Sequence, residues 1–255
     1  VFGWRERRDI HRHHAAPAER RQNQGNDAQG ASTPRSPEQA VLAGFDQLQL
    51  DWQNVGEVLH GSTVGTNAVL ERKGVRTAFL VTEGFRDLLE IQRGDKENIY
   101  DIFYQRTPAL VPRSRVYPIT ERITFDGSVK TPLDEAQVRQ VAAELREENI
   151  QAVAVCFLHS YISPAHEQSV KQILESELPD VLVLMSSEIL PQFREYERAS
   201  TTVMSAYIAP VMSSYVGRLR TELEARGFGG RLLITQSNGG TLPAPAIKRE
   251  VVRTL

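Results

Sequence analysis

Short apolar runs alternate with amphipathic helical segments along most of this chain, and the alternation restricts the folds open to it. Apolar runs long enough for buried strands occur at residues 76–82, 150–158, 181–185 and 231–235. Segments with a helix start signal and one apolar face begin near residues 36, 131 and 164. This order predicts an α/β fold in which helices cover a parallel or mixed sheet.

Three further segments carry local predictions. Residues 85–90 follow a Glu-Gly turn and favour a helix, while residues 116–125 alternate as a strand that turns at an Asp-Gly pair. Residues 191–226 are mostly helical, with a break expected at Pro210. Charge, aromatic residues and proline are frequent in residues 94–118, which predicts an extended excursion on the surface.

Composition excludes several classes of function. A net charge of −2 offers no electrostatic attraction for nucleic acid or membrane surfaces, and no apolar stretch approaches the ~20 residues that span a bilayer. The lone cysteine, Cys156, excludes an internal disulfide and fits a reducing compartment. Its apolar surroundings favour a buried structural thiol over a nucleophile. We therefore expect a cytoplasmic protein that has neither nucleic acid nor a membrane as a partner.

Residues 1–33 differ in composition from the rest of the chain. They carry many arginines and histidines, almost no aliphatic side chains and no helix or strand period, which predicts disorder. A metal-binding tail is the alternative. Because these histidines have no matching cluster farther along the chain, we do not expect a metal site there.

Two polar loops that contain glycine are the main candidates for ligand binding. The run HGSTVGTN, residues 60–67, precedes a short helix, and QSNGG, residues 236–240, follows the last apolar run. Backbone N–H groups at a helix start suit an anion, and adjacent glycines let a ligand approach the backbone closely. Each loop also has a structural alternative, which is a helix cap for the first and a tight turn for the second.

A third polar segment, residues 194–198, has the sequence REYER and leads into the long helical region. Charges at this spacing usually form a solvated helix face. Because an apolar segment follows closely, we favour the alternative of an internal ion network. The sequence contains no Cys and His arrangement with zinc spacing and no Gly-x-Ser-x-Gly elbow.

Four segments together resemble the hydantoinase A/5-oxoprolinase family: HGSTVGTNAVLERKGVRTAFLVTEGFRDLLEIQR, AVAVCFLHSYISPAHE, SSEILPQFREYERASTTVMSAYIAPVM and LLITQSNGG. The resemblance extends over residues 36–255 and implies the mixed-sheet, ribonuclease H-like architecture of the sugar kinase/Hsp70/actin superfamily. It also implies an N-terminal family domain over residues 34–200 and the beginning of a hydantoinase A domain over residues 201–255.

The resemblance further implies an activity. Family members use ATP and Mg²⁺ to open cyclic amides such as 5-oxoproline or hydantoins, and related carboxylase subunits activate ketones. Phosphorylation of a lactam carbonyl oxygen creates a good leaving group, so that water can attack an otherwise poor electrophile. The partners implied are a small cyclic amide and a hydantoinase B-type subunit or domain.

The resemblance assigns site residues only loosely. The catalytic set comprises His60, Thr63, Arg194, Glu195 and Arg198. The loops that would contact substrate or nucleotide comprise Gly61, Ser62, Gly65, Thr66, Asn67, Asn238, Gly239 and Gly240. No protein-bound metal is expected.

The chain departs from the family at both ends. It lacks the family's Gly-Gly-Thr-Phe-Thr-Asp phosphate loop, and it stops before the second half of the nucleotide site. We therefore interpret it as a truncated, incomplete member and expect no lactam-dependent ATP turnover from the isolated 255 residues. The alternatives left open are a ketone carboxylase subunit and a catalytically inactive fragment that binds a partner.

A shift of reading frame accounts for the missing phosphate loop. Residues Arg8 to His14 can be encoded by CGG GAC ATT CAC CGA CAT CAT, which reads Gly-Thr-Phe-Thr-Asp-Ile one nucleotide later. We hypothesise that residues 1–31 are an out-of-frame translation of the phosphate-loop region. Sequencing the gene tests this hypothesis. Codons for Arg8 to His13 that do not encode the loop in the shifted frame would contradict it.

Overall fold

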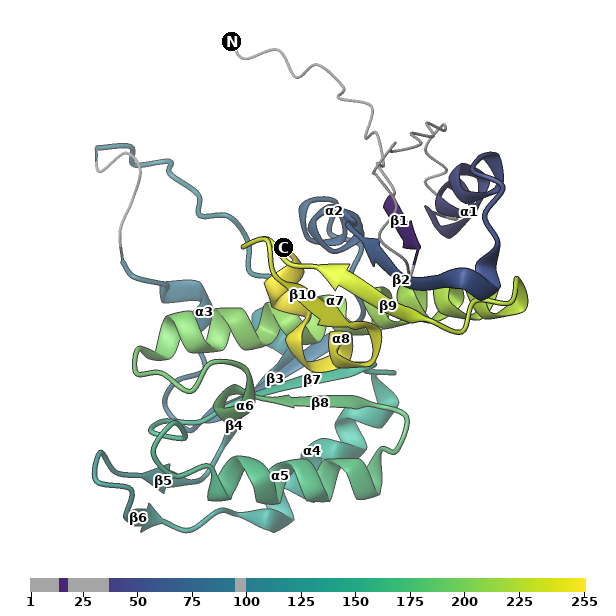
Figure 1. Ribbon diagram of the computed structural model, residues 1–255. Coiled ribbons are helices and arrows are strands. Elements are labelled where there is room, and N and C mark those ends of the chain that lie inside the picture. The colour runs from purple at the N-terminus through teal and green to yellow at the C-terminus, as the bar shows by residue number, and fades with distance from the viewer. Residues whose placement is uncertain (1–13, 18–36, 95–99) are drawn as a thin grey trace. The chain divides into compact units, whose positions relative to one another are not determined.

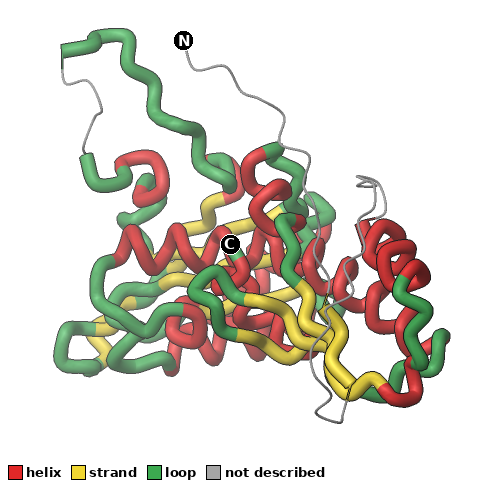
Figure 2. Tube along the Cα trace, turned by 45° about the horizontal axis from the view of Figure 1, so that its top comes forward, coloured by secondary structure: helices red, strands yellow, loops and turns green. Residues whose placement is uncertain are grey.

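The computed structural model describes residues 14–17, 37–94 and 100–255 (Figures 1 and 2). The chain forms two compact units, and each consists of α-helices and β-strands. Unit 1 comprises Val1–Ala68 and Val211–Leu255, and unit 2 comprises Val69–Pro210. The boundaries between the units fall inside helix α2 (Val64–Leu70) and inside helix α7 (Glu195–Ala225).

Unit 1 contains a mixed four-stranded sheet with the order β1-β2-β9-β10. The inner strands β2 (Val55–His60) and β9 (Arg231–Thr235) pair in parallel, while β1 (His14–Pro17) and β10 (Thr241–Pro243) pair antiparallel at the edges. The expectation of disorder over residues 1–33 is therefore wrong at β1, because these residues pair with β2. The other residues of that segment lie outside the described residues.

Helix α1 (Pro37–Gln47) supplies apolar side chains to the core of unit 1. Val41 and Phe45 are fully buried, as the sequence pattern predicted, and Phe45 contacts Trp52 edge-to-face. Helix α8 and three short 3₁₀ turns complete the unit. Their bounds are Ile247–Glu250 for α8 and Trp52–Asn54, Ala244–Ala246 and Val251–Thr254 for the turns.

Unit 2 is built on a parallel sheet with the order β4-β3-β7-β8. Its strands are β4 (Val116–Ile119), β3 (Thr77–Thr82), β7 (Ala152–Cys156) and β8 (Leu182–Met185). Every residue of β3 and β7 is buried, as expected for central strands of a parallel sheet. The mixed α/β architecture with parallel strand pairs confirms the predicted fold class.

Helices α4 (Glu135–Glu147) and α5 (Ala165–Glu177) lie together on one face of this sheet (Figure 1). Asp134 caps α4 by accepting a hydrogen bond of 2.9 Å from the backbone N–H of Gln137. The predicted inner face of α4 is buried against the strands, including Val138 and Leu145, neither of which is exposed. The helix start and the apolar face that the sequence predicted for this helix are therefore both present.

Two local predictions differ from the structure, and a third agrees with it. Helix α3 covers only Leu88–Ile91, because Thr82 and Phe85 accept turn hydrogen bonds before it. The predicted single strand over residues 116–125 is two strands, β4 in the parallel sheet and β5 (Arg122–Ile123) in a hairpin with β6 (Val129–Thr131). Residues 100–112 form the expected extended excursion (Figure 2).

Helix α7 also runs without the break predicted at Pro210. A proline inside a helix removes one backbone hydrogen bond and costs about 3 kcal/mol relative to alanine. Ile208 and Ala209 before the proline and Met212 after it are fully buried. Their burial offsets the local cost, so the helix continues through the proline.

The hairpin of β5 and β6 is closed by the predicted Asp-Gly turn. Asp126 accepts hydrogen bonds from the hydroxyl of Thr124 and from the backbone N–H and hydroxyl of Ser128. These hydrogen bonds lower the pKa of Asp126 to about 2, and the bonds from the hydroxyls of Thr124 and Ser128 contribute most. Gly127 follows with a φ of 84°, a conformation that favours glycine.

Gly74 provides a test of packing in unit 2. A Cβ at this position would overlap the ring of the buried Tyr207, whose carbonyl accepts a hydrogen bond of 3.0 Å from Val75 N–H. We predict that Gly74→Ala lowers the free energy of unfolding by about 1–3 kcal/mol, measured by urea denaturation. The control is Gly217→Ala, because a Cβ on that helical glycine meets no atom within 4 Å. The control should stabilise the protein by up to about 1 kcal/mol, and equal effects of the two variants would contradict the prediction.

Candidate functional site

The two predicted polar loops lie side by side in unit 1. Strands β2 and β9 pair in parallel with His60 opposite Ile234, so the loops that follow them leave the same edge of the sheet. A Cβ built on Gly61 would lie 3.9 Å from the hydroxyl of Thr235, which places the two loop starts in contact. Loops at the carboxyl ends of parallel strands are the usual ligand positions in α/β folds. We call these loops, residues 61–67 and 236–240, the polar edge.

His60 points away from the polar edge and into the core. Its side chain is fully buried, and its Nε2 lies 2.6 Å from the hydroxyl of Tyr215 on α7. Burial raises the pKa of Tyr215 to about 12, so this phenol is neutral at physiological pH. The observed contacts of His60 are structural, and its catalytic role stays a prediction.

The first loop of the polar edge acts in part as a helix cap, which was its structural alternative. The hydroxyl of Ser62 accepts a hydrogen bond of 3.2 Å from Val64 N–H at the start of α2. Gly65 is buried, and a Cβ there would lie 3.1 Å from Leu255 and 3.5 Å from Met212. This glycine therefore permits close packing, whereas Thr63 and Asn67 are exposed and accessible to a ligand.

The second loop forms the turn of the hairpin between β9 and β10. Gln236 N–H donates to Gly240 O at 2.8 Å, and the side chain of Asn238 accepts from Gly240 N–H at 2.9 Å. Gly239 has a φ of 85°, which explains the need for glycine. The loop is thus a tight turn, and Asn238, Gly239 and Gly240 are all exposed at its tip.

The charged segment 194–198 belongs to unit 2 and divides between the surface and the interior. Arg194 is exposed, has a φ of 86° and lies over the ring of Phe193. Glu195 is half-buried at the start of α7. Arg198 is fully buried, but its hydrogen bonds go to two carbonyl oxygens and a sulfur, so they do not form the predicted internal ion network. A single site that combines this segment with the polar edge stays a prediction, because the two belong to different units.

Arg198 is held by groups of the protein. Its guanidinium donates to the carbonyl oxygens of Phe157 at 2.5 Å and Gln192 at 3.4 Å, and to the sulfur of Cys156 at 3.4 Å. Cys156 is buried as predicted, and burial raises its pKa to about 11. A catalytic role for Arg198 stays a prediction that these contacts do not require.

Sequence reasoning missed a buried polar network at the carboxyl ends of β3, β7 and β8. Glu167 on α5 is fully buried and accepts hydrogen bonds from Phe157 N–H, Ser186 Oγ and both the N–H and hydroxyl of Ser187. Nearby, Glu121 accepts from Thr82 and lies 2.8 Å from Nδ1 of His166. Ser186 and Ser187, at the start of helix α6 (Ser186–Ile189), are therefore part of this network. The sequence signal that could have indicated this network is the acidic residue Glu167 in the first turn of α5.

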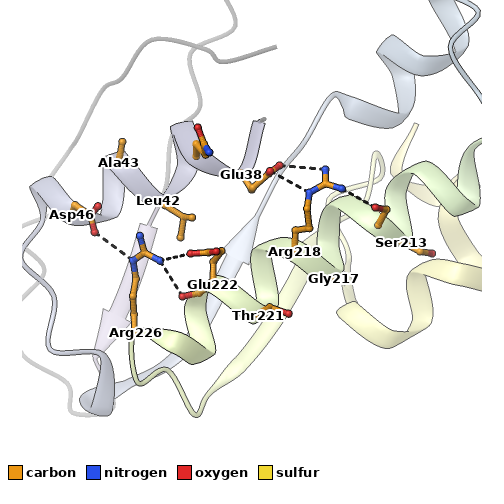
Figure 3. A pocket seen from close by; sticks show the side chains of 12 residues that line it. Glu38, Leu42, Ala43, Asp46, Ser213, Gly217, Arg218, Thr221, Glu222 and Arg226 are labelled. Carbon is orange, nitrogen blue, oxygen red and sulfur yellow. Dashed lines mark hydrogen bonds and ion pairs between the residues drawn. The ribbon is translucent and has the colours of Figure 1, made fainter. Parts of the chain in front are cut away.

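Hollows lie in both units. The groove in unit 1 has a volume of about 620 Å³ and lies between α1 and α7 (Figure 3). Each charged residue lining it has a partner of opposite charge, since Arg218 pairs with Glu38 at 3.2 Å and Arg226 pairs with Asp46 and Glu222. The groove is therefore electrostatically compensated by its own walls. A pocket in unit 2 has a volume of about 480 Å³ and mainly apolar walls, and among the described residues Arg72 is its one charged lining residue.

Within the described part of the chain, no group of three or more His, Cys, Asp or Glu side chains could hold a metal ion. Among the same residues, none of the helices combines the length and apolar character that crossing a membrane requires.

Comparison with known proteins identifies the family. The sequence profile of the hydantoinase/oxoprolinase N-terminal region matches residues 19–178, and the hydantoinase/oxoprolinase profile matches residues 198–255. The chain belongs to the hydantoinase/oxoprolinase family. The first match includes residues 19–31, which the hypothesis of a shifted reading frame counted as out-of-frame, so it speaks against the hypothesis for those residues.

Named relatives include enzymes of two kinds. The chain is 41% identical over 199 residues to the caprolactamase subunit alpha of Pseudomonas jessenii, an alignment that covers 77% of this chain and 29% of the relative. It is 33% identical over 219 residues to the acetophenone carboxylase gamma subunit of Aromatoleum aromaticum, covering 79% of this chain and 30% of the relative. The chain thus spans less than a third of the length of these relatives.

A solved structure shows the same fold. The crystal structure of the ATP-dependent caprolactamase from Pseudomonas jessenii superposes with a TM-score of 0.84 and 34% identity. The match covers 94% of this chain and 38% of that chain. The predicted actin-like architecture is confirmed by this similarity.

The Glu167 network yields a stability prediction. Glu167→Ala leaves four donors without their acceptor inside unit 2. We predict a loss of about 3 kcal/mol or more in the free energy of unfolding, measured by urea denaturation. The control is Asp87→Ala, which breaks the surface ion pair with Arg113 and should change stability little. A wild-type midpoint for the Glu167 variant would contradict a structural role for the network.

Proposed function

We propose that this chain forms part of an ATP-dependent enzyme that opens cyclic amides. The main support is the family match over most of the chain, joined to the exposed polar edge at the carboxyl ends of β2 and β9. By its name, the caprolactamase relative acts on a lactam, and the enzyme whose crystal structure is similar is named as ATP-dependent.

The chemistry follows from the low reactivity of an amide carbonyl. Transfer of the γ-phosphoryl group of ATP to the carbonyl oxygen releases ADP and leaves a carbon that water can attack. Collapse of the adduct breaks the ring C–N bond, a proton goes to the leaving nitrogen, and an acyl phosphate remains. A second water then attacks this acyl phosphate, which releases phosphate and yields the open amino acid. Mg²⁺, when bound with the nucleotide, would neutralise charge on the phosphate oxygens.

Residues of the polar edge are suited to hold phosphate or amide oxygens. Thr63 and Asn67 carry exposed hydroxyl and amide groups, and the exposed glycines at 239 and 240 allow close approach to the backbone. The other residues assigned to the site, Ser62 and Thr66, are half-buried beside them.

A second candidate function is that of a ketone carboxylase subunit, favoured by the similarity to the acetophenone carboxylase gamma subunit. Both named relatives are subunits, which supports a hydantoinase B-type subunit or domain as a partner of this protein. A cytoplasmic location stays part of the same proposal. A catalytically inactive chain that only binds its partner is the third alternative.

ADP release by the full-length gene product, together with its partner subunit, tests the proposal. We expect release with 5-oxoproline, a hydantoin or caprolactam, and none with acetophenone and bicarbonate. Asn67→Ala and Asn238→Ala should each lower kcat/KM about tenfold by removing a hydrogen bond to the reacting molecules. The control Asn54→Ala, exposed in unit 1 outside the polar edge, should leave kcat/KM unchanged. Turnover with the ketone alone would establish the carboxylase alternative.

A further inference from the structure

A buried hydrogen bond anchors the start of the first loop of the polar edge. Tyr215, in the part of α7 that belongs to unit 1, has its hydroxyl 2.6 Å from Nε2 of His60, the last residue of β2. The two rings are also in contact, with centroids 5.6 Å apart and planes at 51°. Because both side chains are buried, water does not compete for this hydrogen bond. A side chain 155 positions away therefore fixes the residue at which the loop leaves its strand.

The same phenol also acts on the loop itself. Burial raises the pKa of Tyr215 to about 12, and the side chain of Ser62 lies close enough to oppose that rise. The phenol is therefore protonated at physiological pH, and its hydroxyl can both donate and accept. Ser62 in turn accepts a hydrogen bond of 3.2 Å from Val64 N–H at the start of α2. Tyr215 thus connects the end of β2 with the start of α2.

A second residue of α7 packs against the middle of the loop. Gly65 is buried, and a Cβ built on it would lie 3.5 Å from the sulfur of Met212. Met212 is fully buried and comes three residues before Tyr215, so the two side chains lie on one face of the helix. One helix therefore holds the loop at two points.

Thr63 and Asn67 lie on either side of Gly65 and are exposed. The N–H of Asn67 donates to the carbonyl of Thr63 at 2.8 Å, and its side-chain amide donates to the hydroxyl of Thr63 at 3.4 Å. These bonds fix the two residues relative to each other. Their position relative to the sheet depends on the contacts of the loop with α7. Groups that act on a ligand need such support, because a displacement of about 0.5 Å already impairs their geometry.

We infer that Tyr215 is a positioning residue for the proposed reaction. Its hydroxyl holds His60 and Ser62, and through them it holds the backbone that carries Thr63 and Asn67. The inference rests on the proposed function, and it adds a buried side chain that acts on the exposed ones. Phenylalanine would fill the same space, so the assignment depends on the hydroxyl alone.

Tyr215→Phe tests the inference in the full-length gene product with its partner subunit. We expect kcat for ADP release with a cyclic amide to fall about tenfold and KM to change less than about twofold, because misplaced groups lose most in the transition state. The matched control is Tyr207→Phe. It removes a buried phenol hydroxyl from the same helix, and within residues 37–94 and 100–255 no hydrogen bond engages that hydroxyl. The control should keep the wild-type kcat, and an equal loss in the two variants would overturn the inference.

Hydrogen exchange measured by mass spectrometry separates positioning from a general loss of stability. Tyr215→Phe should speed exchange at residues 62–67 about five- to tenfold and leave residues 236–240 at the wild-type rate, because the lost bond favours local opening. The control Val41→Ala removes two methyl groups from a fully buried position of α1. It should lower the urea midpoint, yet below that midpoint it should keep kcat and show no selective exchange at residues 62–67. Faster exchange throughout unit 1 in Tyr215→Phe would mark a purely structural role and overturn the inference.

The outcomes separate this residue from the overall function. A Tyr215→Phe variant with wild-type kcat and wild-type exchange at residues 62–67 overturns the positioning role and leaves the proposed function intact. A wild-type protein that releases ADP with no cyclic amide overturns the proposed function, and the role of Tyr215 in that reaction with it. The exchange experiment then still decides whether the phenol holds the loop, since it needs no turnover.

Discussion

Parallel pairing of strands is the constraint on which the rest of this structure depends. Hydrogen bonds between β2 and β9 in unit 1, and among β4, β3, β7 and β8 in unit 2, require the paired strands to run in one direction. Their carboxyl ends therefore meet at one edge of each sheet. Polar residues that are far apart in sequence are collected there, which is why both units have polar side chains concentrated at these edges.

The two edges use their polar residues differently. At the edge of unit 2, Glu167 and Arg198 are buried, and the serines and backbone groups around them satisfy their hydrogen bonds. Such a network stabilises one arrangement of strand ends, because each buried polar group would be costly without its partner. At the edge of unit 1, the loops after β2 and β9 leave hydroxyl, amide and backbone groups exposed. Exposed groups of this kind are available to phosphate or amide oxygens.

The groove of unit 1 and the pocket of unit 2 differ in whether their charged residues form ion pairs. The groove between α1 and α7 contains acids and arginines that pair with one another, so an ionic ligand would have to replace existing ion pairs. Among the described residues, Arg72 is the one charged side chain that lines the pocket of unit 2, and the carbonyl oxygens of Ala109 and Pro108 hold it. A carbonyl dipole orients a guanidinium without cancelling its charge.

Much of the fold could be predicted from the sequence, because helices and strands leave periodic signatures of burial. The sequence by itself determined the apolar strands, the inner face of α4, the buried Cys156, the Asp126 turn and the family resemblance. Only the tertiary structure decided that residues 116–125 serve two sheets, that α7 continues through Pro210, and that His60 faces Tyr215 while Arg198 faces Phe157. The physical reason is distance along the chain. Whether a polar side chain is satisfied by the protein or left for a ligand depends on partners as remote as the 155 positions between His60 and Tyr215, which no local pattern reports.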